Sequence, residues 1–265
     1  MRIIKKILVL ITLTAVLLSI QPQRAIIQAQ TLAGVSATYI RTTLITGIPT
    51  FLWSNWALDP VTGAMLLRNG LPYPDPGTGY YEFERMLNPA KTVIICMDCW
   101  RGMLDPELEA EFNDVAVNQI YPLMEAAADQ GFTTVFLTNN PAQYSYNFGV
   151  NLNLAPIVWY HGGTVLYHQT YDMDNGTTFG NWLRARGIDT LIYVGFASNA
   201  CVLGRREGMF SMQYQFSKIY AVPEAMAGVE YTALGDGTVH DASSLIISLQ
   251  FEIMPLDGLV NALVP

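Results

Sequence analysis

From Lys91 onward, short apolar runs alternate with amphipathic segments, and this alternation restricts the possible folds more than any other feature of the sequence. The apolar runs predict strands at Thr92–Met97, Thr133–Thr138, Val165–His168, Thr190–Phe196 and Lys218–Val222. Helical spacing predicts helices from Pro106 to a stop at Gly131 with a kink at Pro122, and at Phe179–Arg186, Cys201–Gln213 and Asp241–Phe251. Strands and helices in this order predict an α/β domain, a three-layer αβα sandwich with a mostly parallel, Rossmann-like sheet.

In sheets of this kind, ligands bind outside the carboxyl ends of the strands. Asp98, His168 and the turn from Phe196 to Cys201 stand at those ends. Burying an unpaired carboxylate costs several kcal/mol, so Asp98 is a functional acid, a helix cap or a metal ligand. Cys201 opens a predicted helix, where the macrodipole and free N–H groups favour a thiolate, although its position also suits a small core residue.

The chain begins with a segment that resembles a targeting sequence. Arg2, Lys5 and Lys6 precede the uncharged, apolar-rich run Ile7–Ile20. That run is short for a membrane span and typical of a signal peptide. We expect residues 1–29 to be a signal peptide or an uncleaved N-terminal anchor, with a membrane contact only in the second case. Both interpretations place the remaining chain outside the cytoplasm, in the periplasm or secreted.

Residues 30–90 differ in composition from the part that follows. They are rich in aromatic residues, glycine and proline, with turn signals at Asp59-Pro60 and Gly77-Thr78-Gly79. This pattern predicts an extended arm with strands near Ala37–Leu44 and Ala64–Arg68. The arm packs on the main domain or on a neighbouring subunit, and we expect a homo-oligomer.

The net charge of the chain limits which macromolecules it can bind. The formal charge of −8 argues against nucleic acid as a partner, because its phosphates repel an acidic protein.

Cys96 and Cys99 form a C-x-x-C inside a strand-like run, without the second cysteine pair that would complete a metal site. We therefore predict two buried structural cysteines on opposite sides of the strand, unbonded to each other. No cofactor and no metal are expected.

Two blocks resemble the cysteine-hydrolase, or isochorismatase-like, superfamily. The specific block is GIDTLIYVGFASNACVLGRREGMFSMQYQFSKIYAVPEAMAG, in which Gly195, Cys201 and Val202 match the family pattern. The other, TVIICMDCWRGML, is similar to the family's first strand, which ends in its catalytic aspartate. The resemblance implies that residues 91–265 form an isochorismatase-like hydrolase domain.

The family triad is Asp, Lys and Cys, and this chain departs from it. No lysine lies between Asp98 and Cys201, and the lysine position falls at or near His168. We therefore assign Asp98, His168 and Cys201 as catalytic, although His168 can also be a residue that merely ends a strand. The resemblance also implies an oxyanion hole made by the backbone N–H groups of Ala197 and Cys201, with a cis peptide between Phe196 and Ala197.

The resemblance also bears on substrate and metal binding. Nicotinamidases of this family hold a metal after the second strand, where this chain reads LTNNPAQYSYNFG, without Asp or His. A metal site of that type is therefore not expected. These polar and aromatic side chains either bind a neutral polar substrate or only fill a loop. The residues we expect to contact substrate are Trp100, which stands where the family often has glutamine, Asn139, Asn140, Tyr144 and Phe196.

These assignments imply a cysteine-dependent amidohydrolase that cleaves a carbon–nitrogen bond of a small, non-peptide amide. Asp98 takes the proton of Cys201, the sulfur attacks the carboxamide carbon, and water releases the resulting thioester. Two alternatives stay open. The chain is a catalytically inactive binding protein, since the lysine is absent, or it hydrolyses a vinyl ether from Asp98 without using the thiol.

Overall fold

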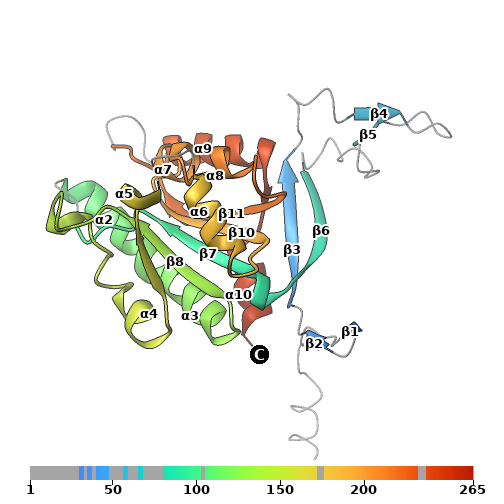
Figure 1. Cartoon of the computed structure of the whole chain (residues 1–265). Helices are drawn as coiled ribbons and strands as arrows, with labels where there is room; N and C mark the ends of the chain where they lie inside the picture. The colour runs from blue at the N-terminus through green and yellow to red at the C-terminus, as the bar shows by residue number, and fades with distance from the viewer. Residues whose placement is uncertain are drawn as a thin grey trace, which may run out of the picture.

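The computed structural model of the chain (Figure 1) describes most of the region from residue 80 to residue 264. The described residues are 30–32, 35–37, 40–47, 56–58, 65–67, 80–102, 105–171, 176–231 and 237–264. The expected signal peptide or anchor, residues 1–29, lies outside them.

Within these residues, the main sheet has eight strands in the order β6-β3-β12-β11-β10-β7-β8-β9. Neighbouring strands pair in parallel along this series: β12 (Glu252–Ile253), β11 (Lys218–Ala227), β10 (Thr190–Phe196), β7 (Thr92–Met97), β8 (Thr133–Thr138) and β9 (Thr164–Tyr167). The mostly parallel sheet expected from the sequence is confirmed. β11 is longer than predicted, and β9 ends one residue early, so that His168 opens the short helix α5 (His168–Tyr171).

Helices cover both faces of this sheet, as Figure 1 shows. One core packs Ile94 and Ile192 against α2 (Pro106–Val115), α3 (Tyr121–Asp129) and α10 (Leu256–Leu263). The other packs the alternate side chains Val93 and Leu191 against α6 (Thr177–Arg184), α8 (Met209–Met212) and α9 (Thr238–Gln250). Continuous apolar strands are thus buried on both faces, and the three-layer sandwich is confirmed.

The helix predicted from Pro106 to Gly131 is interrupted by a π-helical turn just before Pro122. Asp105 caps α2 by accepting a hydrogen bond from the N–H of Glu107 at 2.9 Å. Between α2 and α3 the chain forms a π-helical turn, η3 (Ala116–Ile120). Pro122 has no N–H to donate to the preceding turn, which explains why the helix is interrupted there.

The predicted helix Cys201–Gln213 is wrong. The structure has two four-residue helices instead, α7 (Cys201–Gly204) and α8, joined by the loop 205–208. A Cβ on Gly208 would lie 2.8 Å from the carbonyl oxygen of Val202, so the tight chain reversal requires glycine. Gly204 and Gly208 both weaken a continuous helix, by about 1 kcal/mol each relative to alanine.

Part of the arm joins the sheet. β3 (Ile40–Gly47) pairs antiparallel with β12, and β6 (Tyr80–Leu87) pairs antiparallel with β3. Two small hairpins are also described, β1 (Gln30–Leu32) with β2 (Val35–Ala37), and β4 (Trp56–Leu58) with β5 (Met65–Leu67). The arm therefore lengthens the sheet on the side of β12, far from β9 (Figure 1).

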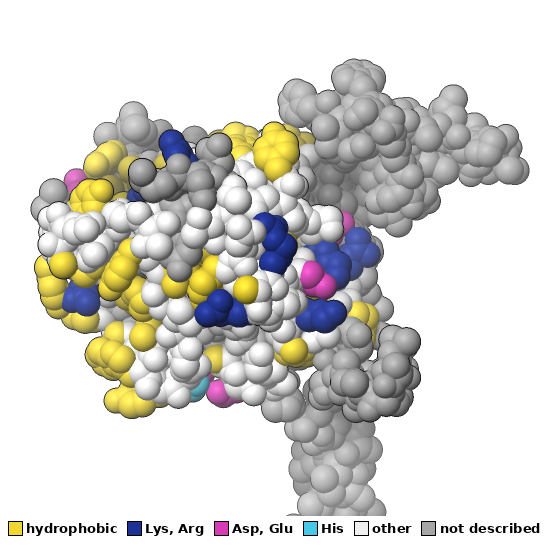
Figure 2. Space-filling view, viewed as in Figure 1, with side chains coloured by type: hydrophobic (Ala, Val, Ile, Leu, Met, Phe, Trp, Pro, Cys, Tyr) yellow, Lys and Arg dark blue, Asp and Glu magenta, His cyan; other side chains and the backbone are white. Residues whose placement is uncertain are grey.

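The surface differs between the two ends of the sheet. On the face shown in Figure 2, apolar side chains gather at the end that carries α4 (Ala155–Tyr160), where Trp159 and Tyr160 are exposed. In the part of the chain that the structure describes, no helix has the length and apolar character needed to cross a membrane.

Candidate active site

Two neighbouring central strands deliver the acid and the thiol to one edge of the sheet. β7 and β10 run parallel with Met97 opposite Gly195, so Asp98 and the turn before Cys201 leave the sheet side by side. Gly195 has φ 107°, and a Cβ there would lie 2.3 Å from the carbonyl oxygen of Met97. Glycine is required here because the two strand ends approach so closely.

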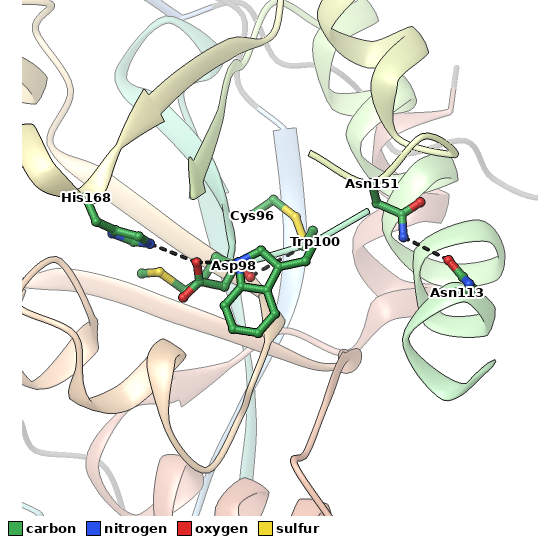
Figure 3. Close-up of a disulfide and its surroundings, with 8 residues drawn as sticks. Cys96, Asp98, Trp100, Asn113, Asn151 and His168 are labelled. Carbon is green, nitrogen blue, oxygen red and sulfur yellow. Dashed lines mark hydrogen bonds and ion pairs between the residues drawn. A yellow bond between two sulfur atoms is a disulfide. The ribbon is translucent and has the colours of Figure 1, made fainter. Parts of the chain in front are cut away.

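Asp98 is fully buried and surrounded by hydrogen-bond donors (Figure 3). Its Oδ1 lies 2.9 Å from Nε2 of His168 and accepts the indole N–H of Trp100 at 3.0 Å. Its Oδ2 accepts a hydrogen bond from Nε of Arg205 at 3.2 Å and forms an ion pair with Nη2 of the same side chain at 3.1 Å. Burial raises the pKa of Asp98, but the hydrogen bond and charge of His168, with the charge of Arg205, outweigh burial and lower the pKa overall. Asp98 is therefore ionised at neutral pH.

Cys201 is a free thiol in contact with this carboxylate. Burial raises its pKa to about 11, and the negative charge of Asp98 adds to the effect, while Arg205 and the backbone N–H of Ala197 act in the opposite direction. The expectation that a helix N-terminus favours the thiolate is thus wrong for the free protein. The helix α7 is only four residues long, and burial beside a carboxylate outweighs it.

The turn between β10 and α7 presents two backbone donors beside the sulfur. The peptide bond between Phe196 and Ala197 is cis. The N–H of Ala197 points at the sulfur of Cys201. The N–H of Cys201 belongs to the first turn of α7, so it has no acceptor within that helix. Both donors of the expected oxyanion hole therefore lie next to the thiol.

His168 enters the site as the first residue of α5, directly after β9, and carries a positive charge. Burial lowers its pKa, but hydrogen bonds to the carboxylates of Asp98 and Glu207 outweigh burial and raise the pKa to about 9. The structure thus brings together Asp98, His168 and Cys201, as the sequence led us to expect. Arg205 and Glu207 were not foreseen. The one clue was the R-R-E run between Gly204 and Gly208 within the predicted helix.

The prediction for Cys96 and Cys99 is wrong, because the two are joined by a disulfide (Figure 3). Strand alternation would send them to opposite sides, but the strand ends at Met97. Asp98 has φ 46°, in the left-handed region, and this turns the chain so that Cys99 returns to the core that contains Cys96. The disulfide therefore spans the acid of the site.

Thiol mapping tests this pairing. The full chain, denatured without reductant, should react with iodoacetamide at Cys201 alone, and after reduction at all three cysteines. Peptide mass spectrometry locates the labels. A Cys96→Ala variant is the control, in which Cys99 and Cys201 should both be labelled without reductant. Alkylation of Cys96 and Cys99 in the unreduced wild-type protein would contradict the disulfide.

A family model described as Isochorismatase domain matches residues 92–227, just over half of the chain. This chain belongs to the isochorismatase-like hydrolase family. The match begins at the first residue of β7 and ends at the last residue of β11, so it contains Asp98, His168, Cys201 and Glu207. No curated protein matches the sequence.

Two solved structures with TM-scores above 0.5 agree with the fold of this isochorismatase-family chain, and a third has a lower score. A cysteine hydrolase from Pseudomonas syringae pv. phaseolicola 1448A is 20% identical over 67% of this chain and 94% of its own, with a TM-score of 0.52. An isochorismatase-like hydrolase from Alkaliphilus metalliredigens is 14% identical over 65% and 98%, with a TM-score of 0.51. The nicotinamidase SaPncA from Staphylococcus aureus is 16% identical over 62% and 96%, with a TM-score of 0.47.

The residues of this chain do not fit the metal site of the nicotinamidases in the family. The loop that follows β8, residues 139–149, contains no aspartate or histidine. Among the described residues, no group of three or more His, Cys, Asp or Glu side chains is arranged to hold a metal ion.

Hydrogen bonds within the isochorismatase domain hold three of the residues expected to contact substrate, Trp100, Asn139 and Asn140. Trp100 donates to Asp98 and packs edge-on against Phe148, with ring centroids 5.0 Å apart. Gln169 joins the loop after β8 to α5, donating to Oδ1 of Asn139 and accepting the backbone N–H of Asn140. Tyr144 is 62% exposed. A cavity of about 130 Å³ between this loop, β9 and α4 is lined by none of Asp98, His168 and Cys201.

The expected substrate contact by Phe196 is corrected by the structure. Its side chain is fully buried and stacks on Phe112 of α2, with ring centroids 4.0 Å apart. The last residue of a strand that is apolar on both faces still points into one of the two cores. Phe196 therefore anchors the turn to the core and leaves only its backbone near the site.

Proposed function

We propose that this isochorismatase-family hydrolase cleaves the carbon–nitrogen bond of a small, neutral, non-peptide amide through a thioester on Cys201. The observation that carries the proposal is the contact between the thiol of Cys201 and the ionised carboxylate of Asp98, with His168 and Arg205 as cations beside it. A nucleophile, a base and fixed positive charge are the parts that acyl transfer requires.

The first half of the reaction forms the thioester. The pKa of Cys201, about 11, lies far above that of Asp98, so in the free enzyme at neutral pH Cys201 is a thiol and Asp98 a carboxylate. The proton therefore passes to Asp98 as the sulfur attacks the carboxamide carbon. The carbonyl oxygen gains the negative charge and is stabilised by the N–H groups of Ala197 and Cys201, at about 3 kcal/mol per donor. Asp98 then protonates the nitrogen, and ammonia or an amine leaves.

The second half returns the enzyme to its starting state. Asp98, ionised again, takes a proton from a water molecule that attacks the thioester carbon. The same N–H groups stabilise the second oxyanion. The carbon–sulfur bond breaks, the carboxylic acid leaves, and the proton on Asp98 returns to the sulfur of Cys201. Atoms and protons balance over the cycle, with water as the only co-reactant.

Two further proposals concern the cellular setting. We infer a location in the periplasm or outside the cell, and the Cys96–Cys99 disulfide supports it, because disulfides persist in oxidising compartments. We also propose that the chain forms a homo-oligomer. Sedimentation of the purified chain measures the mass of the assembly and tests this prediction.

Trapping the intermediate tests the proposed function. A panel of small neutral carboxamides is screened for ammonia release, and the enzyme is quenched in acid during turnover with any substrate found. Mass spectrometry should find the acyl group of the substrate on the peptide that contains Cys201, and hydroxylamine should remove it. Ammonia release without any acyl adduct on Cys201 would contradict the thioester, and no release from any amide would contradict the amidohydrolase.

A further inference from the structure

The ring of His168 lies between two buried carboxylates, of which the proposed chemistry uses only one. Nε2 is 2.9 Å from Oδ1 of Asp98, and Nδ1 is 3.3 Å from Oε1 of Glu207. The three side chains are at most 1% exposed, so water does not replace either contact. Glu207 thus has a place in the site but no part in the steps described above.

Two carboxylates against one imidazole restrict its protonation state. A neutral imidazole has a single N–H, so its other nitrogen would direct a lone pair at a carboxylate oxygen. The imidazolium has two N–H groups and donates to both Asp98 and Glu207. When both acids are carboxylates, the two observed contacts are both hydrogen bonds only if the ring is doubly protonated.

We propose that Glu207 is a positioning residue that keeps His168 as an imidazolium, so that the His168 ring supplies the positive charge that the family obtains from lysine. This inference rests on the proposed amide hydrolysis and names the residue on which its cation depends. The carboxylate of Glu207 contacts His168 and acts through it.

Contacts to the backbone of Glu207 and of its neighbour fix the position of this residue. It lies in the loop 205–208, where the buried hydroxyl of Tyr193 donates to its carbonyl oxygen at 2.6 Å. Gly208, the next residue, has no room for a Cβ. Within the described residues, Oε2 of Glu207 has no hydrogen-bond partner, so the contact of Oε1 with His168 is the hydrogen bond that its carboxylate makes. A buried carboxylate with so few partners is costly and calls for a functional reason.

The charges around the ring support the same assignment. With carboxylates at Asp98 and Glu207 and cations at His168 and Arg205, the charges of the cluster sum to zero when the thiol of Cys201 is neutral. Tyr193, the other titratable group beside Glu207, stays neutral because burial raises its pKa well above the ordinary value. A neutral His168 would leave an uncompensated negative charge next to the developing oxyanion, which opposes the reaction.

The protonation state can be observed without turnover. The chain has three histidines, His161, His168 and His240, so selective ¹⁵N labelling gives three rings, and the spectrum of His168→Lys identifies the one from His168. Both ring nitrogens of His168 should stay protonated up to about pH 9. In Glu207→Gln the titration midpoint should fall by at least about one pH unit, as expected when an opposite charge is lost.

A matched control is available at the surface. Glu125 lies 3.6 Å from Nε2 of His161, but its side chain is 41% exposed. Glu125→Gln should leave the His168 titration unchanged. Steady-state assays give a second measurement. The alkaline pH at which activity falls to half should be lower in Glu207→Gln than in wild type, by the same amount as the NMR midpoint.

A lysine at position 168 stays charged in this range. When His168→Lys is already present, adding Glu207→Gln should therefore leave that alkaline pH unchanged.

Failure of this inference is separable from failure of the proposed function. A His168 ring with one N–H at neutral pH in the wild-type protein, or a midpoint that Glu207→Gln does not lower, would overturn the role of Glu207 even if amides are hydrolysed. The wild-type spectrum decides the first point even where Glu207→Gln fails to fold. A doubly protonated ring in a protein that hydrolyses no amide would leave this arrangement intact and reject the reaction.

Discussion

Cys201→Ala should lower the turnover number for amide hydrolysis by roughly 10⁴-fold or more, the scale on which covalent catalysis is lost. Alanine cannot form the thioester, and the water that remains must attack the amide directly. The side chain is small and partly exposed at the start of α7, so the free energy of unfolding should change by only about 1 kcal/mol. Initial rates of ammonia release and urea unfolding of both proteins provide the comparison.

Cys201→Ser is the companion variant, because it retains the shape and a weak nucleophile. It should be far slower than wild type but accumulate an ester in place of the thioester. If Cys201→Ala retains turnover close to that of wild type, the thiol is dispensable. Asp98 would then have to activate water for direct attack on the amide, and the thioester mechanism would be rejected.

Asp98→Asn should lower kcat/KM by roughly 10³-fold or more, as expected when the general base is lost. The carboxamide cannot take the proton of Cys201, and His168 and Arg205 lose their shared counter-charge. Breaking a buried ion pair in this way should also reduce the free energy of unfolding by about 3–5 kcal/mol. Asparagine tolerates the left-handed φ of this position, so backbone strain does not account for the loss.

Asp129→Asn is the matched control for this substitution. Asp129 also lies beside a histidine, 3.2 Å from Nδ1 of His161, but its side chain is 65% exposed. Its replacement should leave both activity and stability close to wild type. Turnover of Asp98→Asn within about ten-fold of wild type would remove Asp98 from the role of base.

The strands that can be predicted closely are those whose apolar runs are buried on both faces. The predicted bounds Thr92–Met97, Thr133–Thr138 and Thr190–Phe196 agree with the structure residue for residue. Their ends also locate Asp98 and Cys201, because parallel strands present their carboxyl ends at one edge of the sheet. This part of the site follows from local pattern alone.

The rest depends on contacts that local pattern does not contain. Helical spacing continues through the loop 205–208, so Arg205 and Glu207 looked like residues of a helix face, and only Asp98 and His168 across the site give them a role. Strand alternation was extended past Met97 to Asp98 and Cys99, which led to the prediction that Cys96 and Cys99 are not bonded to each other. The thiolate at Cys201 was expected from a helix N-terminus, whereas burial decides its pKa.

The position of β9 has a consequence for how the site resists heating. Asp98 and Cys201 follow β7 and β10, which are flanked on both sides, whereas His168 follows β9, the last strand at its end of the described sheet. Edge strands pair on one side only and open locally at lower free energy than central strands. The nucleophile and the base therefore follow strands of the sheet interior, whereas His168 follows a strand at the edge of the described sheet. Local opening of β9 would remove the charge of His168 and leave the thiol, the carboxylate and Arg205 in place, so we expect activity to be lost before the sheet unfolds.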